Sequence, residues 1–308
     1  MILNFDQLLD AAIRVRAKNV AVIFPNNAET ISAVIKAHEA GLAHFVLVGD
    51  ETGIREKFKE TGKNTEGFDI VDKPRVGEAL QWAIELVRNG RADVLMKGGV
   101  DTSTMMKAVL KEDAGLRTGR LLSDIFIFEY PERVDNKLIM ITDGGITPAP
   151  DLKNKIELVN NAVEVAHALG NPKPKVAILS ATEMVSPNLP STIDAAVLSK
   201  MNERGQIKGC VVDGPLALDN AISTEAAGEK HIDSPVAGKA EILVAPNIES
   251  ANSLAKSTTF FAGLRLAHVI VGAKVPILIP SRADKSDAKL LSVALGVVMS
   301  AFYEDTGK

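Results

Sequence analysis

The stretch Val275-Pro-Ile-Leu-Ile-Pro-Ser-Arg-Ala-Asp-Lys-Ser-Asp287 decides how the chain is interpreted. An apolar run bounded by prolines is typical of a buried strand, and a helical pattern begins where this one ends. Polar groups between the carboxyl end of a strand and the start of a helix suit an anionic ligand, and Ser281, Arg282, Asp284 and Asp287 stand there. A helix cap with a surface charge cluster explains the same residues, so the stretch alone leaves both interpretations open.

The composition excludes several classes of protein. With 308 residues, 46% of them hydrophobic, the chain is long enough for two domains. A net charge of −4 with scattered charges argues against a nucleic-acid partner, which requires a basic face. The absence of a 20-residue apolar run and of a signal-peptide pattern predicts a cytoplasmic protein with no membrane partner. One cysteine, Cys210, and five scattered histidines argue against a disulfide or a metal site.

The order of apolar segments predicts an α/β fold. Strand patterns at residues 20–25, 44–49 and 68–71 alternate with helical patterns, which is typical of parallel strands joined by crossover helices. The runs at 125–128 and 138–141 are separated by a short polar connection and predict an antiparallel pair. A second hairpin is predicted for residues 268–271 and 275–278.

Two doubly wound domains are predicted from this order. The segment 142–150 is rich in glycine and proline and lies between a strand and a helix, which makes it the best candidate boundary. The helical pattern after Asp287 is apolar all round and must be covered on all sides, either by the first domain or by another subunit. We therefore expect a first domain of residues 1–145 plus 282–308 and a second of 146–281.

A second candidate binding loop follows the strand pattern that ends at Lys97. Gly98 and Gly99 would let a ligand approach the backbone, and Thr102 adds a hydroxyl at a helix start. Lys97 and Lys107 supply positive charge on either side. The order and spacing of a Walker motif are absent, and an ordinary strand-to-helix turn with solvated lysines explains the segment equally well.

The polar loops together resemble those of the phosphate acetyltransferase/phosphate butyryltransferase family, and the likeness extends over nearly the whole chain. It is carried by four motifs in the right order, which are Lys97-Gly98 with Thr102 and Lys107, Asp213-Gly-Pro with Asp219 and Asn220, Asn247 with Asn252, and Ser281-Arg282-Ala-Asp284. The resemblance implies a two-domain fold like that of the isocitrate/isopropylmalate dehydrogenases, an interdomain cleft and a homodimer. It also implies reversible acyl transfer between CoA and phosphate, with CoA as substrate and no separate cofactor or metal.

The resemblance also implies roles for single residues. Arg282 would bind phosphate, Ser281 would hydrogen-bond the carbonyl or leaving oxygen, and Asp287 would accept the thiol proton, with Asp284 as its rival. Lys97, Gly98, Gly99, Thr102 and Lys107 would bind substrate, as would Asp213, Asn220, Asn247 and Asn252. Asn247 and Asn252 are also expected as loop and cap residues.

The acyl group is left open by these motifs. Ser281-Arg282-Ala283 replaces the Ser-Arg-Gly of the acetyl-transferring branch, which favours butyryl or branched short-chain substrates over acetyl. A metal- and NAD-dependent decarboxylating dehydrogenase of the same fold and a non-catalytic CoA-binding protein are the alternatives.

Overall fold

The computed structural model describes residues 1–133, 135–281 and 283–308. The chain forms two compact units. We call Phe5–Arg120 with Ala267–Lys308 the terminal unit, and Met1–Asn4 with Leu121–Leu266 the central unit. The chain thus passes between units near residues 4, 120 and 267, whereas the sequence predicted boundaries at 145 and 281. The strand pairing within each unit accounts for the difference.

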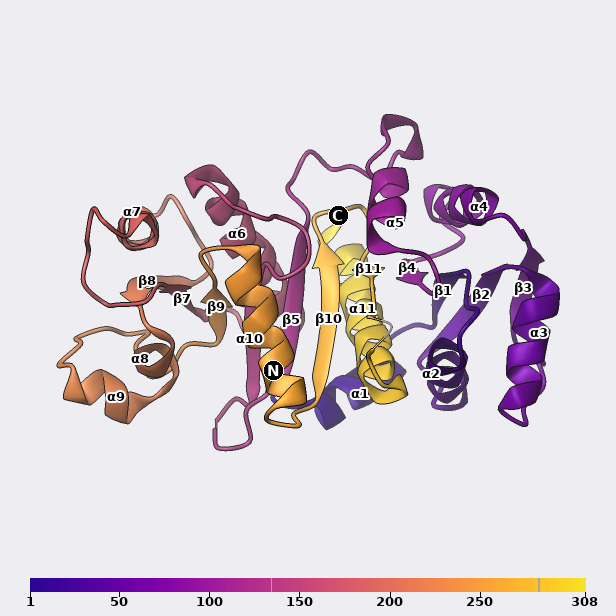
Figure 1. The fold of residues 1–308 in the computed structure, drawn as a ribbon, viewed down its shortest axis with the longest axis horizontal. Coiled ribbons are helices and arrows are strands. Elements are labelled where there is room, and N and C mark those ends of the chain that lie inside the picture. The colour runs from indigo at the N-terminus through magenta and orange to yellow at the C-terminus, as the bar shows by residue number, and fades with distance from the viewer. Residues whose placement is uncertain (134, 282) are drawn as a thin grey trace. The chain divides into compact units, whose positions relative to one another are not determined.

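The terminal unit is an α/β layer structure, as predicted (Figure 1). Its elements, in chain order, are α1 (Phe5–Arg14), β1 (Lys18–Ile23), α2 (Ala28–Glu39), β2 (Ala43–Gly49), α3 (Glu51–Glu60), β3 (Asp69–Asp72), α4 (Val76–Arg88), β4 (Val94–Lys97), α5 (Thr102–Val109), the short 3-10 helix η1 (Glu112–Ala114), β10 (Leu266–Val271, of which Leu266 belongs to the central unit), β11 (Ile277–Leu278) and α11 (Ser286–Thr306).

The strand order of the terminal unit is β3-β2-β1-β4-β11-β10. The pairs from β3 to β11 are parallel, which confirms the crossover pattern expected from the alternation of strands and helices. β10 and β11 pair antiparallel through Ile270 and Ile277, which confirms the predicted hairpin. β11 lies against β4, and this pairing draws the C-terminal hairpin and helix into the same unit as the first strands.

Helix α11 is the core helix of the terminal unit. It packs against α1 and α2 and against strands β4 and β11, and Val293, Leu295 and Val297 are fully buried. Among the described helices it alone is long and apolar enough to cross a membrane, yet 67% of its apolar window is buried inside the structure. A helix that is apolar all round must be enclosed by other elements, and here the rest of the terminal unit supplies them.

The central unit is also α/β. Its elements are β5 (Ser123–Glu129), β6 (Leu138–Thr142), α6 (Leu152–Ala168), β7 (Lys175–Leu179), α7 (Pro190–Glu203), β8 (Val211–Leu216), α8 (Leu218–Ile222), α9 (Thr224–Glu229), β9 (Ile242–Val244) and α10 (Ile248–Phe260).

The strand order of the central unit is β5-β6-β9-β7-β8. β5 and β6 form the predicted antiparallel pair, and the remaining pairs are parallel. β6 pairs with β9 and not with a strand of the terminal unit, so residues 121–145 belong to the central unit. Its core is built from the inward faces of these strands together with α10, and includes Phe126, Ile141 and Leu243.

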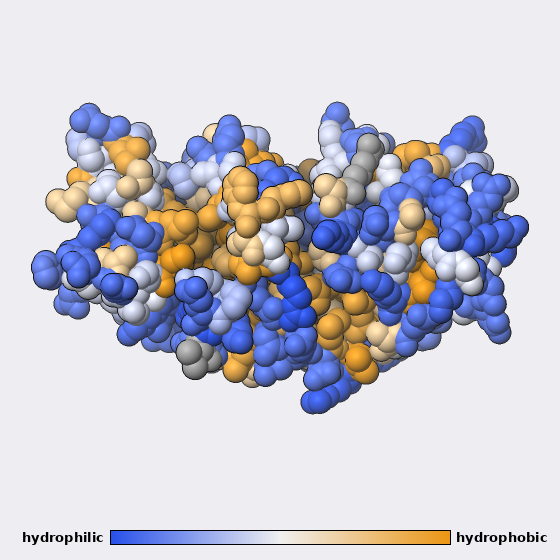
Figure 2. All heavy atoms as spheres, turned by 60° about the horizontal axis from the view of Figure 1, so that its bottom comes forward, coloured by the Kyte–Doolittle hydropathy of each residue, from blue (hydrophilic) through white to orange (hydrophobic). Residues whose placement is uncertain are grey.

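Hydrophilic residues cover most of the face seen in Figure 2, and hydrophobic residues reach the surface between them. The large hydrophobic side chains that are exposed include Met184, Val185, Phe260 and Phe261. These four residues form two pairs of chain neighbours, and exposed apolar residues are by themselves normal for a folded protein. In α/β sheets, ligands bind at the carboxyl ends of the strands.

Candidate active site

Three neighbouring parallel strands of the terminal unit end at one edge, and predicted binding loops follow two of them. β4 pairs in parallel with β1 on one side and with β11 on the other. Leu278, the last residue of β11, stands opposite Met96, which precedes Lys97. The loop after β4 and the turn that begins at Ser281 therefore lie at the same carboxyl edge, which is where α/β sheets bind ligands.

The paired glycines after β4 make room for the protein's own backbone. The amide of Gly98 donates to the carbonyl of Ile23 at 2.8 Å, and the amide of Gly99 donates to the carbonyl of Phe24 at 2.7 Å. A Cβ on Gly98 would lie 2.5 Å from the Phe24 oxygen, and one on Gly99 would lie 1.9 Å from Oδ1 of Asn26. Close approach of the segment from Ile23 to Asn26 is thus a structural reason for these glycines, beside the predicted approach of a ligand.

The start of α5 carries the other predicted residues of this loop. Lys97 is buried at the end of β4, and Thr102 is the half-buried first residue of α5. Asp101 caps the helix by accepting from the amide of Thr104 at 2.8 Å. Hydrogen bonds from the Thr104 hydroxyl and amide hold the pKa of Asp101 below its usual value. The helix start is thus already occupied by a carboxylate, which competes with an external anion for the same amides.

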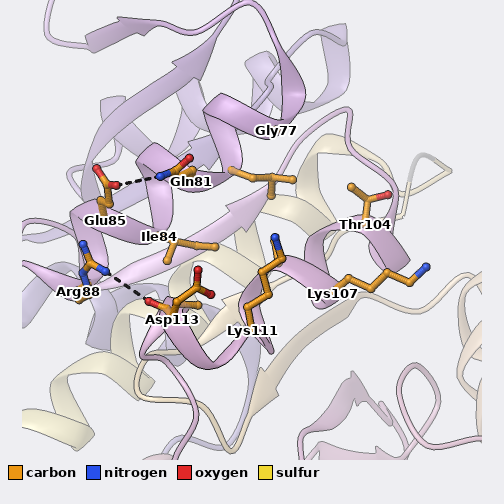
Figure 3. A pocket seen from close by; sticks show the side chains of 12 residues that line it. Gly77, Gln81, Ile84, Glu85, Arg88, Thr104, Lys107, Lys111 and Asp113 are labelled. Atoms are coloured by element: carbon orange, nitrogen blue, oxygen red, sulfur yellow. Dashed lines mark hydrogen bonds between the residues drawn. The ribbon is translucent and has the colours of Figure 1, made fainter.

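A groove of about 460 Å³ lies between α4, α5 and η1. Leu80, Ile84, Ala108 and Ala114 form its apolar lining. Figure 3 shows Lys111 extending its ammonium into the space between the helices, while Lys107 extends away from Gln81 and Ile84. The acidic side chains of Glu85 and Asp113 also line it, and Arg88 donates to the carbonyl of Asp113 at 3.3 Å. Lys107, predicted from the sequence, thus stands at the rim of an apolar groove.

Several hydrogen bonds hold Ser281, Ala283 and Asp284 in a turn. The amide of Ser281 donates to Oδ2 of Asp284 at 2.7 Å, and the amide of Asp284 donates back to the carbonyl of Ser281 at 3.2 Å. The amide of Ala283 donates to the Ser281 hydroxyl at 3.3 Å. The ammonium of Lys289 donates to the carbonyls of Ser281 and Asp284 at 2.8 and 2.6 Å. Arg282, the predicted phosphate ligand, lies outside the described residues.

The two rival aspartates have opposite surroundings. Asp284 is half-buried, with Oδ2 3.7 Å from Nε2 of His268. Burial acts to raise the pKa of Asp284, but the hydrogen bond and charge of His268, the Ser281 amide and the charge of Lys289 outweigh it, so that pKa is lowered. Asp287 is 76% exposed on the first turn of α11, where Lys36 donates to its Oδ1 at 2.9 Å. Asp284 is thus engaged within the protein, whereas Asp287 faces solvent.

Asn247 and Asn252 are engaged in holding α10 in place. Asn247 caps the helix, and its Oδ1 accepts from the amide of Ser250 at 2.9 Å. Nδ2 of Asn252 donates to the carbonyl of Gly144 at 2.8 Å, which ties α10 to the loop after β6. Both residues therefore have the structural roles that the sequence allowed for them.

Asp213 and Asn220 lie near the outer strand of the central unit. The carboxylate of Asp213 accepts from the Ser199 hydroxyl at 3.2 Å and from the Gly214 amide at 2.8 Å. Asn220 is fully buried, and its Nδ2 donates to Glu183 at 3.2 Å. Its Oδ1 is buried without a hydrogen-bond partner among the described residues. Both side chains are thus engaged within the central unit, and the Oδ1 of Asn220 is closed to solvent.

Asp143 is a buried titratable residue that the sequence analysis did not single out. It follows β6, is 2% exposed, and accepts from the amides of Asp124, Gly145, Ile146 and Thr147 at 2.9–3.1 Å. Burial raises its pKa to about 6, with the nearby Asp124 carboxylate adding to the shift and the Gly145 and Thr147 amides opposing it. An aspartate before two glycines at a strand end is the available signal, and in the sequence it coincides with the glycine- and proline-rich segment that predicts a domain boundary.

Comparison with known proteins shows which family this chain resembles. The family model described as "Phosphate acetyl/butaryl transferase" matches residues 73–297. The chain is 43% identical over 300 residues to a phosphate butyryltransferase of Clostridium acetobutylicum, covering 97% of this chain and 99% of that one. It is 42% identical over 295 residues to a phosphate acetyltransferase of Thermotoga maritima, covering 96% and 99%.

A solved structure agrees with these sequence relatives. The crystal structure of a branched-chain phosphotransacylase from Enterococcus faecalis matches with a TM-score of 0.81 and 32% identity, covering 92% of this chain and 99% of that one. This confirms the resemblance drawn from the four loop motifs, and with it the α/β fold class. The chain is an acyltransferase and belongs to the phosphate acetyl/butyryl transferase family.

Proposed function

We propose that this enzyme transfers a short acyl group reversibly between CoA and phosphate, so that acyl-CoA and phosphate give acyl phosphate and free CoA. The observation that carries the proposal is the parallel pairing of β4 with β11. It brings the lysine- and threonine-bearing loop after β4 to the same edge as the turn that begins at Ser281. Family membership supports the proposed reaction, and the polar residues that follow β4 and β11 support its assignment to this edge.

The reaction requires a thiolate, a polarised carbonyl and a holder for phosphate. In the direction of acyl-CoA synthesis, the thiolate attacks the carbonyl carbon of the acyl phosphate and forms a C–S bond. The C–O bond to phosphate breaks, and phosphate leaves with the bonding electron pair. Arg282 binds the phosphate, the Ser281 hydroxyl donates to the carbonyl or leaving oxygen, and Lys107 adds an anion contact. Orientation of two bound substrates contributes up to about 7–11 kcal/mol, and one oxyanion donor contributes about 3 kcal/mol.

Asp287 is the thiol-proton acceptor in this scheme. A thiol with a pKa of about 8.5 costs only about 2 kcal/mol to ionise at neutral pH, so a weak base suffices. Asp287 is exposed and can be reached by a substrate, whereas the carboxylate of Asp284 is engaged with Ser281 and His268. We therefore expect Asp287→Asn to flatten the pH–rate profile. The same effect from Asp284→Asn, with Asp287→Asn unchanged, would reverse the assignment.

Arg282 is tested by its effect on phosphate. Arg282→Ala is expected to reduce turnover by orders of magnitude and to raise the KM for phosphate, because a charge-assisted contact to the transferred group is lost. Steady-state kinetics of acyl-CoA phosphorolysis at varied phosphate concentration measure both constants. Unchanged phosphate kinetics would remove Arg282 from the phosphate site.

The acyl group is proposed to be butyryl or a branched short chain, with acetyl as the alternative. Identities of 43% to a phosphate butyryltransferase and 42% to a phosphate acetyltransferase do not separate the two. Ser281-Arg282-Ala283 in place of Ser-Arg-Gly favours the longer chain. A thiol-consumption assay with acetyl, propionyl, butyryl and isobutyryl phosphates decides, and the highest kcat/KM with acetyl phosphate would overturn the preference.

We further propose a cytoplasmic homodimer that uses CoA as substrate and needs no separate cofactor, metal, nucleic acid or membrane. The predicted chemistry is acyl transfer to a thiol or a phosphate, and neither step transfers electrons. Activity that survives dialysis against EDTA and a molar mass of twice 32.8 kDa by light scattering are the expected results. Loss of activity in EDTA that is restored by a divalent cation would contradict the first expectation.

A further inference from the structure

A buried lysine stands directly beneath the turn that carries the proposed catalytic residues. Lys289 lies on the first turns of α11 and is 2% exposed. Its ammonium donates to the carbonyl of Ser281 at 2.8 Å and to the carbonyl of Asp284 at 2.6 Å. These two carbonyls mark the first and last residues of the turn. One cation thus binds the main chain of both Ser281 and Asp284.

A buried histidine contacts the same turn at the carboxylate of Asp284. His268 on β10 is 5% exposed, and its Nε2 lies 3.7 Å from Oδ2 of Asp284. The same oxygen accepts from the amide of Ser281 at 2.7 Å. The amide of His268 donates to the Ser292 hydroxyl at 3.0 Å, and that hydroxyl donates to the carbonyl of Ala288 at 2.9 Å. The histidine is therefore itself fixed to α11.

This arrangement carries a cost that packing alone does not require. Burial lowers the pKa of Lys289, and the charges of Asp284 and Glu29 oppose that shift. Methionine of nearly the same length would fill the space without burying a charge, and well-packed apolar side chains commonly replace buried charges without loss of stability. What methionine cannot do is donate to two main-chain oxygens. The lysine is therefore best explained by the conformation that it imposes on the turn.

We propose that Lys289 is a positioning residue for acyl transfer, acting through the main chain of Ser281 and Asp284, with His268 holding the Asp284 carboxylate. The inference rests on the proposed function, because it assumes that the Ser281 turn contacts the acyl phosphate. The transferred group is an oxyanion whose reacting atoms must be held closely, and a displacement of about 1 Å can reduce the rate by about 100-fold. Binding of the rest of CoA does not depend on this turn in the scheme.

Lys289→Met is the first test, and Lys18→Met is its matched control. Lys18 is also buried, at 1% exposure in the terminal unit, where its Nζ lies 2.6 Å from Glu304, but it stands at the start of β1 and away from the carboxyl edge. Both variants lose a buried ammonium. We expect Lys289→Met to lower kcat by about 100-fold with the KM for acyl-CoA within about threefold, and Lys18→Met to leave both constants unchanged.

A conservative variant separates positioning from stability. Lys289→Arg keeps a charged donor and is expected to recover about tenfold of the lost kcat. Circular dichroism at the assay temperature establishes that each variant is folded. A folded Lys289→Met enzyme whose kcat stays within threefold of the Lys18→Met enzyme would overturn the proposal. So would a loss that appears only as a raised KM for acyl-CoA.

A second pair of variants decides the matter if Lys289→Met does not fold. His268→Leu removes the contact to Asp284, while His268→Gln keeps a donor at similar reach. We expect the leucine variant to lower kcat by about tenfold and the glutamine variant to restore most of it, and equal kcat for both variants and the unaltered enzyme would overturn the proposal. If the unaltered enzyme phosphorolyses none of acetyl-CoA, propionyl-CoA, butyryl-CoA and isobutyryl-CoA, the proposed function fails and not the positioning role.

Discussion

Each unit has a tight turn after a buried strand. A buried ammonium holds one turn, and a buried carboxylate holds the other. In the terminal unit, the ammonium of Lys289 donates hydrogen bonds to the carbonyls of Ser281 and Asp284. In the central unit, the carboxylate of Asp143 accepts hydrogen bonds from four amides, three of them from Gly145, Ile146 and Thr147. A buried cation turns carbonyl oxygens inward, and a buried anion turns N–H groups inward.

The difference decides what each turn can offer to its surroundings. The Asp143 turn has its amides occupied, and its carbonyl groups are left for donors such as Nδ2 of Asn252, which binds the carbonyl of Gly144. The Ser281 turn has its carbonyls occupied, and it carries a hydroxyl and Arg282 in sequence. The described amides of the Ser281 turn also donate within the turn, so any contact to an anionic substrate would come from its side chains. The Asp143 turn keeps carbonyl acceptors, which serve structural links.

The largest expected effect on stability is that of Asp143→Ala. Four amides would lose their acceptor, and an unsatisfied buried donor costs about 1–3 kcal/mol, partly recovered by water, so we expect a loss of about 4 kcal/mol in unfolding free energy. Urea denaturation measures it. Asp151→Ala is the control, because Asp151 caps α6 in the same unit with one amide, and we expect about 1 kcal/mol there. Equal losses would show that the buried carboxylate does not organise its turn.

The pH dependence of stability should distinguish the two buried charges. The pKa of Asp143 rises from 3.8 to about 6 in the folded state. The folded protein therefore binds a proton at Asp143 more tightly than the unfolded chain does. Its contribution to stability is fully present below pH 3.8 and is lost as the pH rises through 6, about 3 kcal/mol in all. The unfolding free energy of the unaltered protein minus that of Asp143→Asn should therefore fall between pH 4 and pH 7.

The matching measurement on Lys289 should have the opposite sign. The pKa of Lys289 is lowered in the folded state, so the unfolded chain binds its proton more tightly. The unfolding free energy of the unaltered protein minus that of Lys289→Met should therefore rise as the pH approaches 10.5. Urea denaturation at pH 8 and pH 10 measures the change. A difference that falls over this interval would contradict the buried cation.

A smaller effect is expected from Asn252→Ala. The change removes one hydrogen bond to the carbonyl of Gly144 and should cost about 1 kcal/mol in unfolding free energy. Thermal unfolding monitored by circular dichroism measures it. Turnover should change little if the contact only links α10 to the Asp143 turn. A large fall in kcat/KM with stability preserved would instead place Asn252 at the substrate, as the sequence proposed.

The smallest expected effect is that of Lys36→Ala. Lys36 pairs with Asp287 across side chains that are 45% and 76% exposed, and such surface pairs contribute about 0–1 kcal/mol. Unfolding free energy should change by about 0.5 kcal/mol or less. A loss well above this value would contradict a solvent-exposed pair of little weight.

The sequence by itself determined the α/β class, both hairpins and the family. Alternation of apolar strands with amphipathic helices is a local pattern, and it survives folding because each strand and helix buries its own apolar face. The short connection between residues 125–128 and 138–141 likewise left little choice but an antiparallel pair. The loop motifs identified the family because four of them occur in the right order along one chain.

Only the tertiary structure decided which of these residues are engaged and which are available. Asp284 and Asp287 are three residues apart and chemically alike, yet one faces His268 and the other faces solvent. Asn252 and Gly144 meet across 108 residues of chain. The physical reason is that the burial and the hydrogen-bond partners of a side chain depend on how distant segments pair. No local sequence pattern predicts the pairing of β6 with β9 or of β11 with β4.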